Sequence, residues 1–201
     1  MSITIKANQL RHVILVHGID DNGKIFRTMA DALSEKKYVV HVVEYHPSDG
    51  SVGMNHLAAQ ITQYVDRNLK NVKKFDVIGF SMGGLITRYY IQNLGGAAKV
   101  NHLVNISTPH RGTWTGYLRW NDGGRQLRPG SEFLKELNSN MQSYKDIKWA
   151  SLRTPYDVVI LPSKSSVMEG VQNAKFPVLF HAGMVKDKRV IQWVTDFLEK
   201  P

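Results

Sequence analysis

Short apolar runs and stretches of helical spacing alternate along this chain. Continuous apolar runs of this length are typical of strands buried on both faces, and apolar residues three or four positions apart indicate helices. The runs predict strands at 13–16, 38–43, 75–80, 100–106, 156–160 and 177–180, with a short edge strand at 3–5. The spacing predicts helices at 26–33, 54–69, 85–94, 131–137 and 190–198. The alternation favours a mostly parallel central sheet with helices on both faces.

Residues from about 110 to 148 interrupt this alternation. Gly, Asn, Arg and Trp dominate the segment, apart from the helix predicted after Ser131, a typical N-cap residue. A connection of this length is longer than an ordinary one and is usually functional. We expect it to lie above the carboxyl ends of the strands, with Trp114, Tyr117 and Trp120 as candidate substrate contacts. Two interpretations stay open: a lid or lipid-contacting rim, and a cap with a small core of its own.

The composition narrows the functional class. The 201 residues suit a single domain, 1–201, and carry a formal net charge of +9 with no cysteine. Basic residues are scattered among acidic ones and no nucleic-acid motif occurs. A solvated basic surface is therefore the simpler interpretation, and an anionic membrane surface is the alternative partner. We expect no nucleic acid, metal or cofactor. Because neither a signal peptide nor a membrane-spanning run is seen, we expect a cytoplasmic protein.

One segment carries the strongest chemical signal. It reads FDVIGFSMGGL at 75–85 and contains the nucleophile-elbow spacing Gly-x-Ser-x-Gly around Ser81. An apolar strand precedes the motif and a helical pattern follows it, as the motif requires. A serine at so sharp a turn is strained, and Gly79 and Gly83 let the strand and the helix approach each other. The helix also directs its positive N-terminal end at the place where an oxyanion would form. Ser81 is the candidate nucleophile; a glycine-rich turn without chemistry is the alternative.

A serine nucleophile needs a base and an acid that orients the base. In a sheet of this kind the three residues follow in the order Ser, Asp or Glu, His, each at the carboxyl end of a strand. Only His110 and His181 follow Ser81 in loops near predicted strand ends, and His181 directly follows the last one. Asp157 is the acid in that order that lies near a predicted strand. We predict that Ser81, Asp157 and His181 are catalytic. The fallback acids are Asp146 and Asp187.

The tetrahedral intermediate of acyl transfer needs hydrogen-bond donors for its oxyanion. One donor is the backbone N–H of the residue after the nucleophile, which is Met82. The other comes from the loop after the early strand, where His17, Gly18 and Ile19 stand. Gly18 allows the backbone to turn so that the N–H of Ile19 faces the site. We predict Ile19 and Met82 as the oxyanion donors and His17 as a further candidate substrate contact. A simple turn at the strand end is the alternative.

These motifs resemble those of the small microbial serine lipases and esterases of the α/β-hydrolase fold. The segment HGI at 17–19 is similar to their oxyanion segment, and GFSMGG at 79–84 is similar to their elbow. Weaker likenesses occur at 88–90, 107–112, 157–162 and 181–198. The resemblance runs from about 11 to 198 and implies an α/β-hydrolase fold with an inserted cap or lid at about 110–148. Phe80 stands where many relatives carry histidine, and we expect this change to alter packing behind the nucleophile without loss of chemistry.

The expected function is hydrolysis of carboxylic esters. The resemblance implies a lipase or esterase that acts on acylglycerol or other lipid-like esters through an acyl-enzyme. A thioesterase or an amidase would use the same residues, because one acyl-transfer machinery serves several leaving groups. The alternative from another class is a non-catalytic relative that binds a lipid or a partner through its basic surface.

Overall fold

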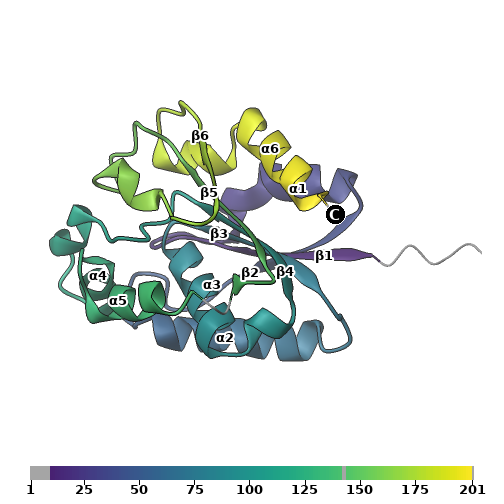
Figure 1. Ribbon diagram of the computed structural model, residues 1–201, viewed down its shortest axis with the longest axis horizontal. Helices are drawn as coiled ribbons and strands as arrows, with labels where there is room; N and C mark the ends of the chain where they lie inside the picture. The colour runs from purple at the N-terminus through teal and green to yellow at the C-terminus, as the bar shows by residue number, and fades with distance from the viewer. Residues whose placement is uncertain (1–9, 142–143, 201) are drawn as a thin grey trace, which may run out of the picture.

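A parallel sheet of six strands forms the centre of the molecule (Figure 1). The computed structural model describes residues 10–141 and 144–200, so the edge strand expected at 3–5 lies outside the described residues. The order across the sheet is β2-β1-β3-β4-β5-β6, and every pair of neighbouring strands is parallel. The strands are β1 (Arg11–Val16), β2 (Tyr38–Val43), β3 (Phe75–Phe80), β4 (Val100–Ile106), β5 (Lys148–Arg153) and β6 (Gln172–Lys175).

The connections between the strands are mostly helical. The α-helices are α1 (Arg27–Glu35), α2 (Met54–Asn68), α3 (Met82–Asn93), α4 (Asp122–Leu127), α5 (Glu132–Ser139) and α6 (Lys188–Leu198). Short 3₁₀ helices are η1 (Gly23–Phe26), η2 (Gly96–Ala98), η3 (Trp114–Leu118), η5 (Ser163–Ser166) and η6 (His181–Val185). Across residues 10–141 and 144–200, none of the helices combines the length and the apolar character needed to cross a membrane.

Alternate residues of the central strands face two separate helical layers. Val13 and Leu15 of β1 pack in a core cluster with residues of α1 and α6, whereas Ile14 and Val16 pack with residues of α2 and α3. All four side chains are fully buried, so β1 is covered on both faces, as its continuous apolar run predicts. Figure 1 shows α1 and α6 on one side of the sheet and α2, α3, α4 and α5 on the other. The predicted α/β architecture is confirmed.

The last two predicted strands are wrong. Residues 156–160 form turns, because the carboxylate of Asp157 accepts hydrogen bonds from the N–H groups of Val159 and Ile160. Residues 177–180 form a loop, and β6 precedes them as a short polar strand at the edge of the sheet. Short polar edge strands protect a sheet from further pairing, and a search for apolar runs misses them.

The insertion predicted at about 110–148 lies between β4 and β5 and contains η3, α4 and α5. Ser131 caps α5 by accepting a hydrogen bond from the N–H of Leu134, in agreement with its predicted role. The buried apolar residues of α5 belong to the same core cluster as those of α2 and α3; they are Phe133, Leu134 and Leu137. The insertion therefore packs on the main core instead of forming a core of its own.

Candidate active site

The predicted nucleophile lies on a strained turn between β3 and α3. Ser81 has φ 54° and ψ −125°, a conformation that a residue other than glycine keeps only where its surroundings enforce it. Its N–H donates a hydrogen bond of 2.9 Å to the carbonyl oxygen of Ile106 at the end of β4. The turn therefore holds Ser81 at the carboxyl edge of the sheet, where the loops after all six parallel strands meet.

Two glycines beside Ser81 permit the close approach that this turn needs. A Cβ on Gly79 would lie 2.5 Å from the Cα of Gly84 in α3. A Cβ on Gly83 would lie 2.2 Å from the carbonyl oxygen of His17, just after β1. Neither position has room for a side chain. The structural reason given for the Gly-x-Ser-x-Gly spacing agrees with these contacts.

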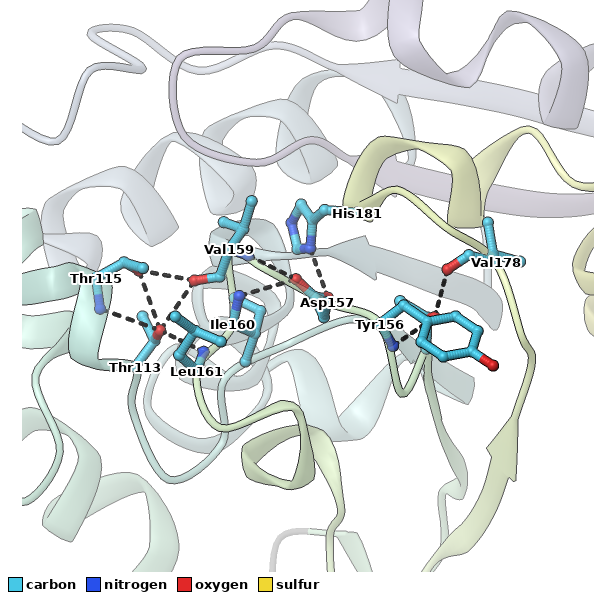
Figure 2. Close-up of polar contacts among 10 residues, drawn as sticks. Thr113, Thr115, Tyr156, Asp157, Val159, Ile160, Leu161, Val178 and His181 are labelled. Atoms are coloured by element: carbon cyan, nitrogen blue, oxygen red, sulfur yellow. Dashed lines mark hydrogen bonds and ion pairs between the residues drawn. The ribbon is translucent and has the colours of Figure 1, made fainter.

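The predicted acid and base are in direct contact (Figure 2). The Nδ1 of His181 lies 2.8 Å from the Oδ2 of Asp157. The other carboxylate oxygen, Oδ1, accepts hydrogen bonds from the N–H of Val159 (2.9 Å) and of Ile160 (2.8 Å). The side chain of Asp157 is almost fully buried and that of His181 is 11% exposed. Three hydrogen bonds thus hold the carboxylate in one orientation towards the imidazole.

These hydrogen bonds also determine the charge of the acid. Burial by itself raises the pKa of the Asp157 carboxyl, but the hydrogen bond and charge of His181 and the N–H groups of Ile160 and Val159 hold that pKa below its ordinary value. Asp157 is therefore ionised at neutral pH and acts as an acceptor. Assigned from this hydrogen bond, the proton of a neutral His181 lies on Nδ1, and its Nε2 carries the lone pair that a general base needs.

The ring of Phe80 packs against the ring of His181, with 4.7 Å between the ring centroids. Phe80 precedes Ser81 directly, so this contact places the imidazole beside the elbow. In the described part of the chain, the Nε2 of His181 has no hydrogen-bond partner. Hydrogen bonds between a nucleophile and its base often tighten only when substrate binds. Phe80 thus packs against the predicted base, whereas the sequence suggested packing behind the nucleophile.

The loop after β1 lies against the nucleophile. A Cβ on Gly18 would lie 3.0 Å from the Cβ and 3.5 Å from the Oγ of Ser81. The hydroxyl of Tyr45 lies 3.0 Å from the carbonyl oxygen of His17 and 3.0 Å from that of Gly18, and it donates a shared hydrogen bond to them. This contact holds the loop in place. Met82 is the first residue of α3, so its N–H has no acceptor within the helix. Both predicted oxyanion donors therefore belong to backbone segments that flank Ser81.

A cavity of about 490 Å³ opens beside Ser81. Most of its lining is apolar or small, and one cation, Arg119, contributes to the wall. The lining residues are Ile19, Ser81, Pro109, Thr113, Thr115, Gly116, Leu118, Arg119, Leu127, Val158, Val159 and Ile160. The insertion and the turn that carries Asp157 therefore form most of the wall, as expected for a segment above the carboxyl ends of the strands.

The predicted substrate contacts do not line this cavity. His17 is buried, stacks on Tyr45 with ring centroids 4.3 Å apart, and has a pKa that burial lowers. Trp114, Tyr117 and Trp120 are exposed on the insertion, around the cavity rather than inside it. The imidazole of His17 is therefore buried against Tyr45 and does not reach the cavity. The three aromatic side chains lie on the surface of the insertion, where Trp114 also lines a separate pocket of about 250 Å³.

The palmitoyl protein thioesterase family matches residues 12–119, which is more than half of the chain. The chain belongs to the palmitoyl protein thioesterase family. The match contains the oxyanion loop and the elbow serine, while Asp157 and His181 lie beyond it. The prediction of a lipase- or esterase-like hydrolase, made from the elbow and oxyanion motifs, agrees with this membership.

Solved structures of several hydrolases share the fold of this family member. The mature lipase BlEst2 of Bacillus licheniformis superposes with a TM-score of 0.80 at 14% identity, over 98% of this chain and 96% of that chain. Lipase B of Aspergillus fumigatus gives 0.76 at 16% identity, over 89% of this chain and 50% of that chain. A pyrethroid hydrolase of Sphingobium faniae gives 0.66 at 17% identity, over 95% and 98%. The α/β-hydrolase fold predicted for the chain is confirmed.

The alternative base and one of the fallback acids of this family member have partners outside the triad. His110, the other candidate base, is fully buried, and its Nδ1 lies 3.2 Å from a guanidinium nitrogen of Arg88. Asp187 caps α6 and pairs with Arg189. Among the residues that the structure describes, no three His, Asp or Glu side chains are placed to hold a metal ion.

Two threonines that the sequence analysis did not single out connect the insertion to the acid (Figure 2). The hydroxyls of Thr113 and Thr115 donate to the carbonyl oxygen of Val159, over 2.9 Å and 2.7 Å. The hydroxyl of Thr113 also accepts a 2.9 Å hydrogen bond from the N–H of Leu161. Leu127, which lines the cavity, belongs to α4, a helix that was also missed. Asn121, a typical N-cap residue followed by an acid, is the local signal for that helix.

Proposed function

We propose that this chain is a serine hydrolase that cleaves carboxylic esters through Ser81, His181 and Asp157. In the first step the Ser81 hydroxyl attacks the ester carbonyl and passes its proton to Nε2 of His181. The imidazolium then gives this proton to the departing alkoxide, which leaves as the alcohol. Water attacks the acyl-enzyme in the same way, again losing its proton to His181, and releases the carboxylic acid. Asp157 stays ionised throughout and holds the imidazole in the required tautomer.

The oxyanion of each tetrahedral intermediate would be stabilised by the backbone N–H groups of Ile19 and Met82. The position of Met82 at the start of α3 adds the positive end of the helix dipole. A backbone donor survives substitution of its own side chain, so changes at these two residues act on the donors only through geometry.

One observation carries this proposal. The buried carboxylate of Asp157 orients the imidazole of His181 through a 2.8 Å contact. The two residues lie at the same edge of the sheet as Ser81, whose φ is 54°, and beside a mostly apolar cavity. Structural ion pairs are common, but a strained serine, an oriented imidazole and a cavity rarely coincide without chemistry.

The cavity favours a substrate with an apolar acyl group. Leu118, Leu127, Val158 and Ile160 contribute to its wall, and apolar walls of this kind bind hydrocarbon by excluding water. A thioester is the second candidate, because the matched family is named for thioesterases. Both leaving groups require the same nucleophile, base and oxyanion donors.

We also propose that the face around the cavity contacts lipid. Within the described residues, every exposed large apolar side chain except Leu10 lies in a segment that follows β4, β5 or β6 and precedes the next strand or helix α6. Exposed cations stand among them, including Arg111, Arg125 and Lys164. An apolar face rimmed by cations suits peripheral contact with an anionic membrane surface. Fractionation of cells that express the chain tests this contact, together with the cytoplasmic location, which stays a prediction.

Labelling with a fluorophosphonate tests the catalytic proposal. We expect the wild type to be labelled and Ser81→Ala not to be. Ser107→Ala is the matched control, because Ser107 is also buried and also has a positive φ, 49°, and it should keep the label. A folded wild type without label would contradict the proposal and favour a non-catalytic relative. A panel of esters, thioesters and amides of several acyl lengths then identifies the preferred leaving group and chain.

A further inference from the structure

The insertion is joined to the oxyanion loop by one ion pair. The two terminal nitrogens of Arg119 face the two carboxylate oxygens of Asp20: Nη1 lies 3.4 Å from Oδ1, and Nη2 donates to Oδ2. Nη1 also donates to the carbonyl oxygen of Asp49 over 3.1 Å. The fork of an arginine that meets both oxygens of a carboxylate fixes orientation as well as distance. Asp20 directly follows Ile19, whose N–H is the proposed oxyanion donor.

Two neighbouring segments hold the backbone at Asp20. Its φ is 55°, in the left-handed region, which few residues besides glycine, asparagine and aspartate adopt. Its N–H donates a 2.8 Å hydrogen bond to the carbonyl oxygen of Ser48, and its side chain is held by Arg119. The backbone and the side chain of Asp20 are thus tied to two different segments, and these contacts restrain the position of Ile19 directly before it.

The segment that supports Asp20 is itself held by the insertion. The side-chain amide of Asn121 donates to the carbonyl oxygen of Asp49 (3.0 Å). The N–H of Gly123 donates to the carbonyl oxygen of Gly50 (2.8 Å). A Cβ on Gly50 would lie 2.9 Å from the Cδ1 of Ile19, so this segment also packs directly on the donor residue. The insertion therefore supports the oxyanion loop from one side and, through Thr113 and Thr115, the acid-bearing turn from the other.

We propose that Arg119, acting through Asp20, is a positioning residue for the N–H of Ile19. This inference rests on the proposed ester hydrolase function. An oxyanion donor stabilises the transition state only when it points at the developing charge, and small displacements are costly. Loss of the ion pair would release Asp20 and let the neighbouring Ile19 shift, so that the Gly18–Ile19 peptide, which carries the donor N–H, turns away from the site. Because the donor acts on the transition state, the loss should lower kcat and leave KM nearly unchanged.

Arg119 also lines the cavity, so direct contact with substrate is the competing explanation. Asp20 separates the two, because it is not among the lining residues. If Arg119 bound substrate, its removal would raise KM and Asp20→Asn would have little effect on kcat. If Arg119 acts as a positioning residue, the two substitutions should have the same kinetic signature.

The experiment is a double-mutant cycle measured with a short-chain p-nitrophenyl ester. The variants are Asp20→Asn, Arg119→Gln, the double variant, and Arg119→Lys as the conservative rescue. Asn tolerates the left-handed region, so Asp20→Asn removes the charge and keeps the backbone conformation accessible. Arg189→Gln is the matched control, because Arg189 forms a similar forked ion pair with Asp187 at the start of α6.

We expect each single variant to lower kcat by about tenfold, less than the loss of an entire oxyanion donor, with KM within about twofold of wild type. The double variant should lose no more than either single variant, which would show that the two residues act as one unit. Arg119→Lys should recover part of the loss, and Arg189→Gln should match wild type. Thermal unfolding of each variant confirms that it is folded.

Three outcomes would overturn the inference: unchanged kcat in Asp20→Asn, a change in KM alone in Arg119→Gln, or additive losses in the double variant. Failure of the proposed function looks different, since the wild type itself would then neither hydrolyse ester nor take the fluorophosphonate label.

Discussion

A guanidinium nitrogen of Arg88 lies 3.2 Å from the Nδ1 of His110, and both side chains are fully buried. Arginine has only donors, so the Nδ1 of His110 accepts and the imidazole is neutral, with its proton on Nε2. That nitrogen lies 3.1 Å from the hydroxyl of Ser151, which in turn donates to the carbonyl oxygen of Ser166. Burial lowers the pKa of His110 well below its ordinary value, and the charges of Arg88 and Arg111 lower it further.

This arrangement predicts a loss of stability on mild acidification. The unfolded chain takes up a proton at His110 below about pH 6.5, the ordinary pKa of histidine, whereas the folded chain does not. The free energy of unfolding should therefore fall as the pH drops through this value, with a slope from His110 that approaches about 1.4 kcal/mol per pH unit. Urea unfolding of wild type and of His110→Gln at pH 7, 6 and 5 measures how the free energy of unfolding depends on pH.

The variant should show a shallower pH dependence than wild type. Burial also lowers the pKa of His17 and His41, and these groups contribute to both proteins, so the difference isolates His110. Parallel stability curves for the two proteins would contradict the neutral, buried assignment.

Substitution of the predicted acid should separate orientation of the base from its presence. Asp157→Asn keeps the size of the side chain but presents an amide to the Nδ1 of His181 and favours the wrong tautomer. We expect kcat for ester hydrolysis to fall by about 10⁴-fold. Asp187→Asn is the matched control, because Asp187 is one of the two fallback acids and asparagine also caps helices. Equal kinetics for the two variants would remove Asp157 from the mechanism.

Gly79→Ala should disturb the elbow by steric conflict. Its Cβ would meet the backbone of α3 at Gly84, which cannot move without displacing the turn at Ser81. We expect a loss of about 1–3 kcal/mol in unfolding free energy, together with low activity per folded molecule. Gly95→Ala is the control: Gly95 has φ 83° and open space around its Cα, so its substitution strains the backbone far from the site. That variant should keep full activity, and a fully active Gly79→Ala would contradict the close-approach argument.

The aromatic residues around the cavity should act on lipid substrates in particular. Trp114 and Trp120 are 61% and 79% exposed, and their rings are available to bury acyl chains. We expect Trp114→Ser and Trp120→Ser to reduce binding to anionic vesicles and hydrolysis of long-chain esters, while hydrolysis of short-chain esters changes little. Leu10→Ser is the control, because Leu10 is 63% exposed but lies away from this face. An equal effect on long and short chains would show that these residues do not set acyl preference.

The inner strands β1, β3 and β4 could be predicted from the sequence because burial on both faces selects continuous apolar runs. The edge strand β2 is apolar as well, although its four middle residues are only partly buried. β2, β3 and β4 have the predicted bounds. The same rule failed at Val158 and Val159, which are apolar but partly or largely exposed on the turn beside the cavity. There, the apolar residues are exposed on a turn and are not buried in a strand, and no local sequence pattern distinguishes these two cases.

The residues of the candidate site also differ in how far they can be predicted from the sequence. Ser81 could be predicted because the elbow is a local motif whose glycines lie close to the serine in sequence. Asp157 and His181 were predicted from chain order and from their places beside strands expected at 156–160 and 177–180, neither of which forms. Thr113 and Arg119 could not be found, because their partners lie 46 and 99 residues away and depend on the path of the insertion.

The side chains of the insertion fall into two groups, one that anchors the insertion and one that is exposed. Its anchoring groups, such as Thr113 and Asn121, bond to the rest of the molecule, whereas Trp114, Leu118 and Trp120 are largely exposed, and Leu118 also borders the cavity. None of these three exposed side chains takes part in a hydrogen bond that holds the oxyanion loop or the acid. Substitution of these side chains should therefore change which esters this scaffold accepts, while the hydrogen bonds that hold the oxyanion loop and the acid stay in place.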